Sequence, residues 1–432
     1  MADANAPKVP FPGDLDPDFG QRSLAVPGMI KTVVESIAVM TSEKILVCVS
    51  ALDAKGLWHL YLWRLLANGD SDPAFGSDGC KPIEFEVAEP TKGVEIIAYG
   101  GGAFLLTGSE QDSQGNWKLF VALFRNEGDL LDLDFGDSKT GRFFFKSTVP
   151  AVEHASQCQL ALAKSNPEAG EVDRVISVIV KGGVAVMACY LFDGTLWDGF
   201  ADKGWFVVTL PEHQINVKGV RVLPNGRSLI YGWTVGVQKG FVIAIDSVGK
   251  PVPSFGKNGV VLLDSSVVSD SRESALHHIV PLSDGCVLVG FASVVPSGEP
   301  EQEPRQHGIM IKIDLDGQID QKFKTVFTDP VDSKDLHSFI NAFPVDGTAA
   351  GSIVGVGQKT GSAGRLLARS YGADDGDVDS SFIKDGGNCN PWHPIAACLH
   401  GQGVVIGGID NPEVKLRRIL VNRPVNSQPP AG

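Results

Sequence analysis

One short pattern recurs seven times along the chain and constrains the fold more than any other feature. It consists of Gly, two residues, Asp or a substitute, two residues and Phe, and one copy carries an extra residue. The spacing between successive copies is 55 to 68 residues, with the phenylalanines at Phe19, Phe75, Phe135, Phe200, Phe255, Phe323 and Phe382. Seven copies at so regular an interval predict seven consecutive structural units of similar size.

Each unit contains four short β-strand patterns. In the fourth unit, apolar segments at 220–224, 228–232, 241–245 and 259–263 are separated by polar turns, and the repeated motif precedes the last of them. Asn-Gly and Asp-Gly pairs at the strand ends supply the positive φ angles that tight hairpins need. The 50 glycines and 26 prolines are typical of a turn-rich all-β chain. Four strands per unit, repeated seven times, predict a seven-bladed β-propeller.

The two ends of the chain predict how the ring closes. The last unit has strand patterns at 395–399, 404–408 and 415–421, but no motif or fourth strand follows them. The missing parts are found at the N-terminus as Gly13–Gly20 and Ser23–Val26. We therefore expect residues 1–30 to complete the seventh blade, which removes two open sheet edges. The prediction is one propeller domain over residues 1–432, with residues 423–432 as a disordered tail.

The motif resembles the repeat of the bacterial delta-sixty repeat family, whose units carry a Gly-x-Leu-Asp-x-x-Phe-Gly-x-x-Gly core. The most similar copies are Gly13–Gly20, Gly69–Gly79 and Gly376–Gly386. Other copies depart from it, with Trp197 or Val252 in place of Asp, and Lys324 or Ile383 in place of the Gly after Phe. The resemblance covers nearly the whole chain and implies a β-propeller from a bacterial source. It implies no activity, because the family is not defined by one.

Composition narrows the classes of partner and location. With 37 basic and 51 acidic residues, the net charge of −14 argues against nucleic acids and anionic membranes as ligands. No apolar run is long enough to cross a membrane and the N-terminal residues lack a signal-peptide pattern, so we expect a cytoplasmic protein, with non-classical export as the alternative. We also expect a monomer. The seven cysteines lie mostly in apolar strands, which is typical of reduced core residues.

The repeated Asp residues are expected to be architectural. A catalytic residue is needed once, whereas Asp16, Asp72, Asp132, Asp320 and Asp379 occupy one position in five units. We expect their carboxylates to accept backbone N–H bonds while the Phe rings fill the space between blades. Calcium at the alternating carboxylates Asp14, Asp16 and Asp18 is the alternative. Zinc at Cys389, His393, Cys398 and His400 is a second metal hypothesis, although the spacing matches no common zinc motif.

A second set of positions differs from unit to unit and is the predicted ligand site. The first strand of each blade should line the central channel, and near its start each unit carries a polar residue: Glu35, Glu95, Gln159, Lys218, His277 with His278, His337 and His393. We expect Glu35, Glu95, Lys218, His277, His337 and His393 to ring one mouth of the channel, with Lys218 attracting an anionic group. If the strand starts are level, the three histidines on adjacent blades could converge on a divalent metal. The alternative is that these positions are polar only because the channel is wet.

These features favour a non-enzymatic binding propeller that recognises a protein or a glycan on its loop face. The loop Ser293–His307, which carries Glu299, Glu301 and Glu303, is the longest on that face. An enzyme of the lactonase or lyase kind, using the channel-mouth residues as metal ligands or acid and base groups, is the alternative function. A lectin is the third, but only Trp58 and Trp117 are equivalent aromatic residues, and other units lack the match. No cofactor is firmly predicted.

Overall fold

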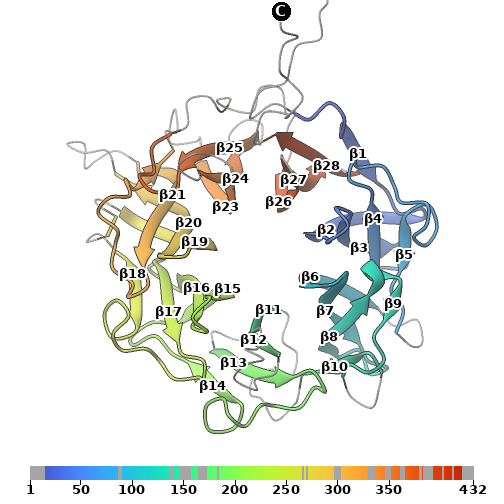
Figure 1. Ribbon diagram of the computed structural model, residues 1–432, viewed down its shortest axis with the longest axis horizontal. Helices are drawn as coiled ribbons and strands as arrows, with labels where there is room; N and C mark the ends of the chain where they lie inside the picture. Colours follow the sequence, from blue (N-terminus) through green and yellow to red (C-terminus); the bar gives the residue numbers. More distant parts are fainter. Residues whose placement is uncertain are drawn as a thin grey trace, which may run out of the picture.

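The computed structural model describes about four fifths of the chain. The described residues are 15–85, 90–136, 140–145, 157–163, 173–181, 184–264, 267–268, 271–295, 303–328, 336–345, 352–360, 365–378, 382, 393–400, 403–410 and 413–420. They form seven antiparallel sheets that are arranged as blades around one axis, which confirms the predicted all-β propeller (Figure 1).

The blades follow one another in chain order, and each begins with its innermost strand. Blade 1 contains β2 (Met29–Val39), β3 (Ile45–Asp53), β4 (Trp58–Leu65) and β5 (Cys80–Pro82). Blade 2 contains β6 (Thr91–Gly100), β7 (Ala103–Gln111), β8 (Trp117–Arg125) and β10 (Arg142–Phe144), with β9 (Leu130–Leu131) also paired to β8. Blade 3 contains β11 (Gln157–Ala163), β12 (Arg174–Lys181), β13 (Val184–Leu191) and β14 (Trp205–Val208).

Blades 4 to 7 repeat the same order. Blade 4 contains β15 (Ile215–Val222), β16 (Ser228–Thr234), β17 (Gly240–Ile245) and β18 (Val260–Leu263), and blade 5 contains β19 (Ser271–Pro281), β20 (Gly285–Val294), β21 (Arg305–Asp314) and β22 (Val326–Phe327). In blade 6 the described strands are β23 (Leu336–Val345), β24 (Ser352–Thr360) and β25 (Arg365–Gly372). Blade 7 contains β26 (His393–His400), β27 (Gly403–Asp410), β28 (Glu413–Leu420) and β1 (Gln21–Leu24).

The N-terminal strand closes the ring, as predicted. β1 lies antiparallel to β28, with Gln21 opposite Arg417 and Leu24 opposite Val414. Figure 1 shows this blue strand beside the red strands of the last blade. The observed strand begins two residues before the predicted Ser23–Val26 segment. The tail predicted at residues 423–432 lies outside the described residues.

The hydrophobic core lies between the blades. Seven clusters of buried side chains are found, and each draws its residues from two neighbouring blades. The cluster at the closure, for example, joins Val34 and Val49 of blade 1 to Val405 and Leu416 of blade 7. Because both faces of every sheet are covered in this way, the middle strands are almost continuously apolar.

The repeated Phe and Gly residues contact each other across the blade boundaries. All seven motif phenylalanines are at most 4% exposed. Gly69 of blade 1 has a φ of +84°, and a Cβ added there would lie 2.8 Å from the ring of Phe19 in blade 7. The same Gly-on-Phe contact recurs as Gly128 on Phe75, Gly249 on Phe200, Gly317 on Phe255 and Gly376 on Phe323. The motif therefore fastens neighbouring blades together at these five boundaries, and its glycine is required there by both backbone conformation and space.

The motif Asp residues bind both the backbone and a basic side chain. One carboxylate oxygen of Asp72 accepts the N–H of Ala74 at 3.0 Å, and the other accepts Arg64 Nε at 2.7 Å. Equivalent backbone bonds are made by Asp16, Asp132 and Asp320. Their basic partners are Arg418, Arg125 and Lys312. The arginines also reach the next blade, since Arg64 Nη1 donates to Glu127 O and Arg418 Nη1 donates to Ala67 O.

Blades 3 and 4 have lost both members of this ion pair. Trp197 and Val252 replace the Asp. Cys189 and Ala244 replace the basic residue, since their carbonyl oxygens accept the Trp197 and Val252 N–H groups as the Arg64 carbonyl accepts the Asp72 N–H in blade 1. In blade 3 the guanidinium of Arg174 instead lies 3.9 Å from the centre of the Trp197 ring. A cation–π contact thus replaces a salt bridge at the same place in the fold.

The disc has two chemically different faces. We call the face with the Gly-x-x-Asp-x-x-Phe turns the motif face; its described turns include 66–79, 126–136, 193–204, 246–259 and 315–325. We call the opposite face the loop face; it holds the turns between the second and third strands, such as 54–57, 112–116 and 235–239. Inner strands begin at the loop face and end at the motif face, because every blade repeats the same antiparallel order.

Candidate functional site

The innermost strands share an irregularity that sequence reasoning did not predict. In six of the seven blades the pairing between the first and second strands shifts by one residue, which places a β-bulge at Glu35, Val94, Lys218, His277, Ile340 and Ile395. Glycines of the second strand allow the bulge. An added Cβ would lie only 1.9 to 2.3 Å from an inner-strand carbonyl oxygen at Gly108, Gly232, Gly290 and Gly357. Bulges redirect side chains and are common beside binding sites.

The bulges give a common register for the predicted site residues. Glu35, Lys218 and His277 occupy the bulge itself, and Glu95 follows the bulge of blade 2 by one residue. His393 precedes the bulge of its strand by two residues, and His337 by three. At roughly 3.3 Å per residue, His337 is displaced by about 10 Å along the strand from the level of His277.

The three histidines therefore occupy three different levels. His337 is 1% exposed, and its backbone carbonyl accepts a bond from Gln306 Nε2 at 3.2 Å. His393 begins β26, and its side chain lies outside the described part of the chain. Within the residues that the structure describes, no three His, Cys, Asp or Glu side chains are grouped so that they could hold a metal ion. Of the predicted loop Ser293–His307, residues 296–302 are not described.

Three blades contribute to a cluster of polar side chains near the axis, which we call the axial cluster: Glu95, Lys218, Arg221, Tyr231, His277 and His278. Glu95 belongs to blade 2 and Arg221 to blade 4, yet Glu95 Oε1 and Arg221 Nη1 are only 4.0 Å apart. A contact between blades that are not neighbours requires both side chains to reach across the inner strand of blade 3. There, Leu160 N donates to Glu95 Oε2 at 3.5 Å.

Burial changes the charge state of this cluster. It raises the pKa of Glu95, while the charges of Arg221 and Lys218 and the Leu160 N–H act in the opposite direction. Burial also lowers the pKa of His278 well below its ordinary value, and both cations add to this effect. His278 is therefore neutral near pH 7. The pKa of Tyr231 is raised, first by burial, so that its phenol stays protonated.

His277 presents one defined tautomer. Its Nδ1 lies 3.0 Å from the carbonyl oxygen of Phe339 in blade 6 and 3.2 Å from Ser338 Oγ. Burial lowers the pKa of His277 to about 4, and the charge of Lys218 adds to this effect. Because a carbonyl oxygen can only accept, the neutral ring carries its proton on Nδ1. Nε2 therefore offers a lone pair to a ligand.

Two tryptophans form a second cluster on the loop face, between blades 1 and 2. We call this set the tryptophan cluster: Lys31, Glu35, Trp58, Lys92 and Trp117. The Lys92 ammonium lies 4.2 Å from the centre of the Trp58 ring and 5.5 Å from that of Trp117. Glu35 lies close to Lys92 and Lys31 and bonds to Ser50, although burial is the larger effect and raises the pKa of Glu35. The structure thus separates Glu35 from the axial cluster.

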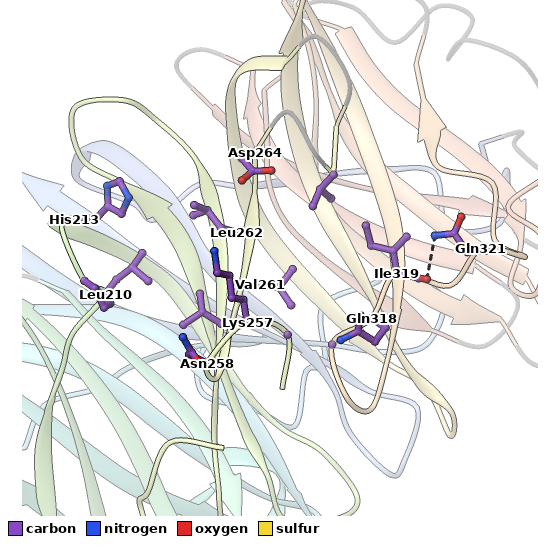
Figure 2. A pocket seen from close by; sticks show the side chains of 15 residues that line it. Leu210, His213, Lys257, Asn258, Val261, Leu262, Asp264, Gln318, Ile319 and Gln321 are labelled. Carbon is purple, nitrogen blue, oxygen red and sulfur yellow. Dashed lines mark hydrogen bonds between the residues drawn. The ribbon is translucent and has the colours of Figure 1, made fainter. Parts of the chain in front are cut away.

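The rim of the disc carries a groove along the outer strand of blade 4. Its volume is about 800 Å³. Figure 2 shows β18 between Leu210 and His213 on one flank and Gln318 and Ile319 on the other. The chain itself covers the start of this strand edge, since Lys257 and Val260 exchange backbone bonds of 2.7 and 3.3 Å. This turn blunts an edge that could otherwise pair with another strand.

Sequence reasoning missed Arg221 and Tyr231. Arg221 lies three residues after the bulge of β15, at a level where Ala38 and Val280 fill the equivalent positions of blades 1 and 5. Tyr231 comes from the second strand. Its hydroxyl would lie 2.1 Å from a Cβ added at Gly219, so a glycine in the inner strand makes room for the phenol. Gly219 and Gly232 are the sequence features that could have indicated this arrangement. Their role becomes clear only from the strand register, in which Gly232 allows the bulge and Gly219 makes room for the Tyr231 phenol.

Comparisons with known proteins show the fold alone. No protein-family model matches the chain, and no curated protein matches its sequence. Solved structures that resemble it include Drosophila Semaphorin 2a, which is 9% identical, covers 93% of this chain and 75% of its own, and has a TM-score of 0.50. Raptor from Chaetomium thermophilum is 10% identical with a TM-score of 0.42, and the match covers 93% of this chain but 30% of the Raptor chain. The Nup133 β-propeller domain of Vanderwaltozyma polyspora is 11% identical, with coverages of 92% and 99% and a TM-score of 0.38.

These similarities leave the function to be argued from the site, because one fold hosts many activities. In the described part of the chain, no helix has the length and apolar character to span a membrane.

Proposed function

We propose that this protein is a non-enzymatic binding propeller whose loop face recognises a partner protein. The observation that carries the proposal is the distribution of exposed apolar side chains. Of the twelve large apolar residues that are exposed in the described chain, seven lie on the loop face: Ile30, Leu57, Val184, Val235, Val237, Phe327 and Leu336. They come from blades 1, 3, 4, 5 and 6.

The tryptophan cluster adds aromatic anchors to this surface. Trp58 and Trp117 are half-buried at the starts of the third strands of adjacent blades, where they hold Lys92 between them. Tryptophan is enriched among residues that dominate protein–protein binding energy. A sugar would favour aromatic faces at equivalent positions in most blades, whereas exposed apolar side chains from five blades, all but Phe327 aliphatic, suit a protein surface.

The repeat supports a further part of the proposal: the chain is one propeller domain related to the delta-sixty repeat proteins. The contacts of these residues explain why such a motif recurs, since Gly and Phe meet across a blade boundary and Asp binds the arginine that reaches the next blade. That role involves the motif face, which is filled by the chain's own turns. The loop face is left for a ligand.

Site-specific photo-crosslinking tests the proposal. A photoreactive phenylalanine analogue is placed at Val237, which is 65% exposed on the loop face, or at Leu133, which is 58% exposed on the motif face. In native host cells we expect a discrete covalent protein adduct from position 237 and none from position 133. Substituting Trp58 and Trp117 by Ala should remove the adduct while the protein stays folded. Adducts from position 133 alone, or from neither position, would overturn the proposal.

A further inference from the structure

The inner strands carry positive charge in an acidic protein. The whole chain has a formal charge of −14. The seven inner strands nevertheless hold five cations, Lys31, Lys92, Lys218, Arg221 and Arg272, against three carboxylates, Glu35, Glu95 and Glu273. Within the axial cluster, Lys218 and Arg221 face the single carboxylate of Glu95. The middle of the ring therefore attracts anions although the molecule as a whole repels them.

Both cations of the axial cluster keep binding capacity. Lys218 is exposed, and its ammonium makes no hydrogen bond or ion pair with any other residue that the structure describes. Arg221 has five N–H donors. Among the described residues, it makes one hydrogen bond, from Nη1 to Val220 O at 3.0 Å. Its distance of 4.0 Å from Glu95 is at the limit of an ion pair and is no hydrogen bond.

The neighbouring groups complete a set of donors and acceptors. The hydroxyl of Tyr231, on β16, lies over Gly219 of β15, the strand that carries the two cations. The His277 Nδ1–H donates to the Phe339 carbonyl, so its Nε2 can accept a hydrogen bond from a ligand hydroxyl. Two cations on one strand, with a lone-pair acceptor on the next blade, match an oxyanion that also carries an O–H group.

We propose that the axial cluster binds a small ligand through a carboxylate or phosphate group held by Lys218 and Arg221. The bulge at Lys218 is what turns this side chain out of the inter-blade core, and the Gly232 of the second strand makes the bulge possible. The hydroxyl or protonated oxygen of the ligand faces His277 Nε2. This site goes beyond recognition of a protein on the loop face and does not depend on it.

Calorimetric titration at constant ionic strength tests the proposal, with inorganic phosphate and glycolate, a carboxylate that also carries a hydroxyl group, as separate probes. We expect saturable binding of at least one probe, and a loss of about tenfold or more in affinity for Lys218→Met. Lys257→Met removes the same charge from the exposed rim groove and should leave the affinity within about twofold. Arg221→Gln should weaken binding as Lys218→Met does.

The location of binding is read from the histidines. In protein labelled selectively at the histidine ring carbons, the His277 resonance, assigned with His277→Gln, should shift and saturate with the probe. Saturation by phosphate alone identifies a phosphate ligand, and saturation by glycolate alone identifies a carboxylate ligand. Linear, unsaturated shifts with both probes would overturn the proposal, as would an unchanged affinity in Lys218→Met. Neither outcome would bear on the loop-face partner, because no partner is present.

Discussion

The motif face and the loop face of the disc are built by opposite rules. On the motif face the same few residues recur from blade to blade, and each contacts the next blade, as Phe19 contacts Gly69 and Arg64 contacts Glu127. On the loop face and at the axis the residues differ between blades, and large apolar or charged side chains remain exposed. Repetition therefore marks the parts that hold the ring together, and variation marks the parts that are available to a ligand. Changes on the motif face should accordingly cost more stability than their counterparts elsewhere.

Removal of the N-terminal strand should have the largest effect. Deleting residues 1–30 removes Phe19, which is fully buried, and leaves β28 as an open edge in the seventh blade. We expect aggregation and the loss of a cooperative unfolding transition, measured by circular dichroism and light scattering. A truncated protein that melts like the full chain would contradict the closed ring.

Acid should weaken the motif face through Asp72. Burial on its own would raise the pKa of this carboxyl group, but bonds from the Ala74 N–H, Lys44 and Arg64 outweigh it and lower the pKa. A carboxyl group with a lowered folded-state pKa stabilises the protein above its unfolded pKa of about 4, and this stabilisation is lost as the pH falls through the folded value. The free energy of unfolding should therefore fall below about pH 4.

The matched variant Asp72→Asn isolates this contribution. It should be less stable than the natural protein at pH 7, because the Arg64 guanidinium, 3% exposed, loses its nearer carboxylate partner and keeps the more distant Asp129. Its stability should also fall less steeply below about pH 4, since one titrating group is gone. Urea unfolding at a series of pH values measures both effects. Parallel curves for the two proteins would exclude Asp72 as a source of the acid sensitivity.

Two glycines give the finest comparison between the faces. Gly69 on the motif face and Gly56 on the loop face have φ angles of +84° and +83°, but only at Gly69 would a Cβ meet the Phe19 ring. Gly56→Ala should cost about 1–2 kcal/mol from backbone strain alone. Gly69→Ala should cost about 1 kcal/mol or more beyond that, because the ring must move. Equal losses in urea unfolding would show that the Gly-on-Phe contact contributes nothing.

The fold could be predicted because its determinants are repeated. Because the motif recurs seven times, a strand assignment that is ambiguous in one unit can be checked against the other units. The missing strand after Val421 indicates where the ring closes. The buried state of Phe75 and the backbone bonds of Asp72 follow from the same repetition. The basic partner of the Asp was overlooked. It lies eight residues before the Asp in Arg64–Asp72 and Lys312–Asp320 and seven residues before it in Arg125–Asp132, and Cys189 and Ala244 take its place where Trp197 and Val252 replace the Asp.

The candidate site was harder to predict because its geometry depends on register. Convergence of His277, His337 and His393 required level strand starts, whereas, measured from the bulges, His393 and His337 lie two and three residues before the level of His277. A shift of one residue turns a side chain to the other face of a strand. Lys218, His277 and Glu95 do share one cluster, but Arg221 and Tyr231 join it from positions that no repeat marks. Such contacts across the axis depend on tertiary packing and leave no pattern in the sequence.

The difference between the two faces can be measured within single blades. Phe75 and Trp58 are large aromatic residues of blade 1 on the motif face and the loop face, and Phe135 and Trp117 are their counterparts in blade 2. Urea unfolding of the four Ala variants should show a loss of about 3–5 kcal/mol for Phe75→Ala and Phe135→Ala. Trp58→Ala and Trp117→Ala should each lose less than about 1 kcal/mol, because their rings keep solvent contact. Losses of equal size, or larger losses for the tryptophans, would contradict the division between a structural motif face and a binding loop face.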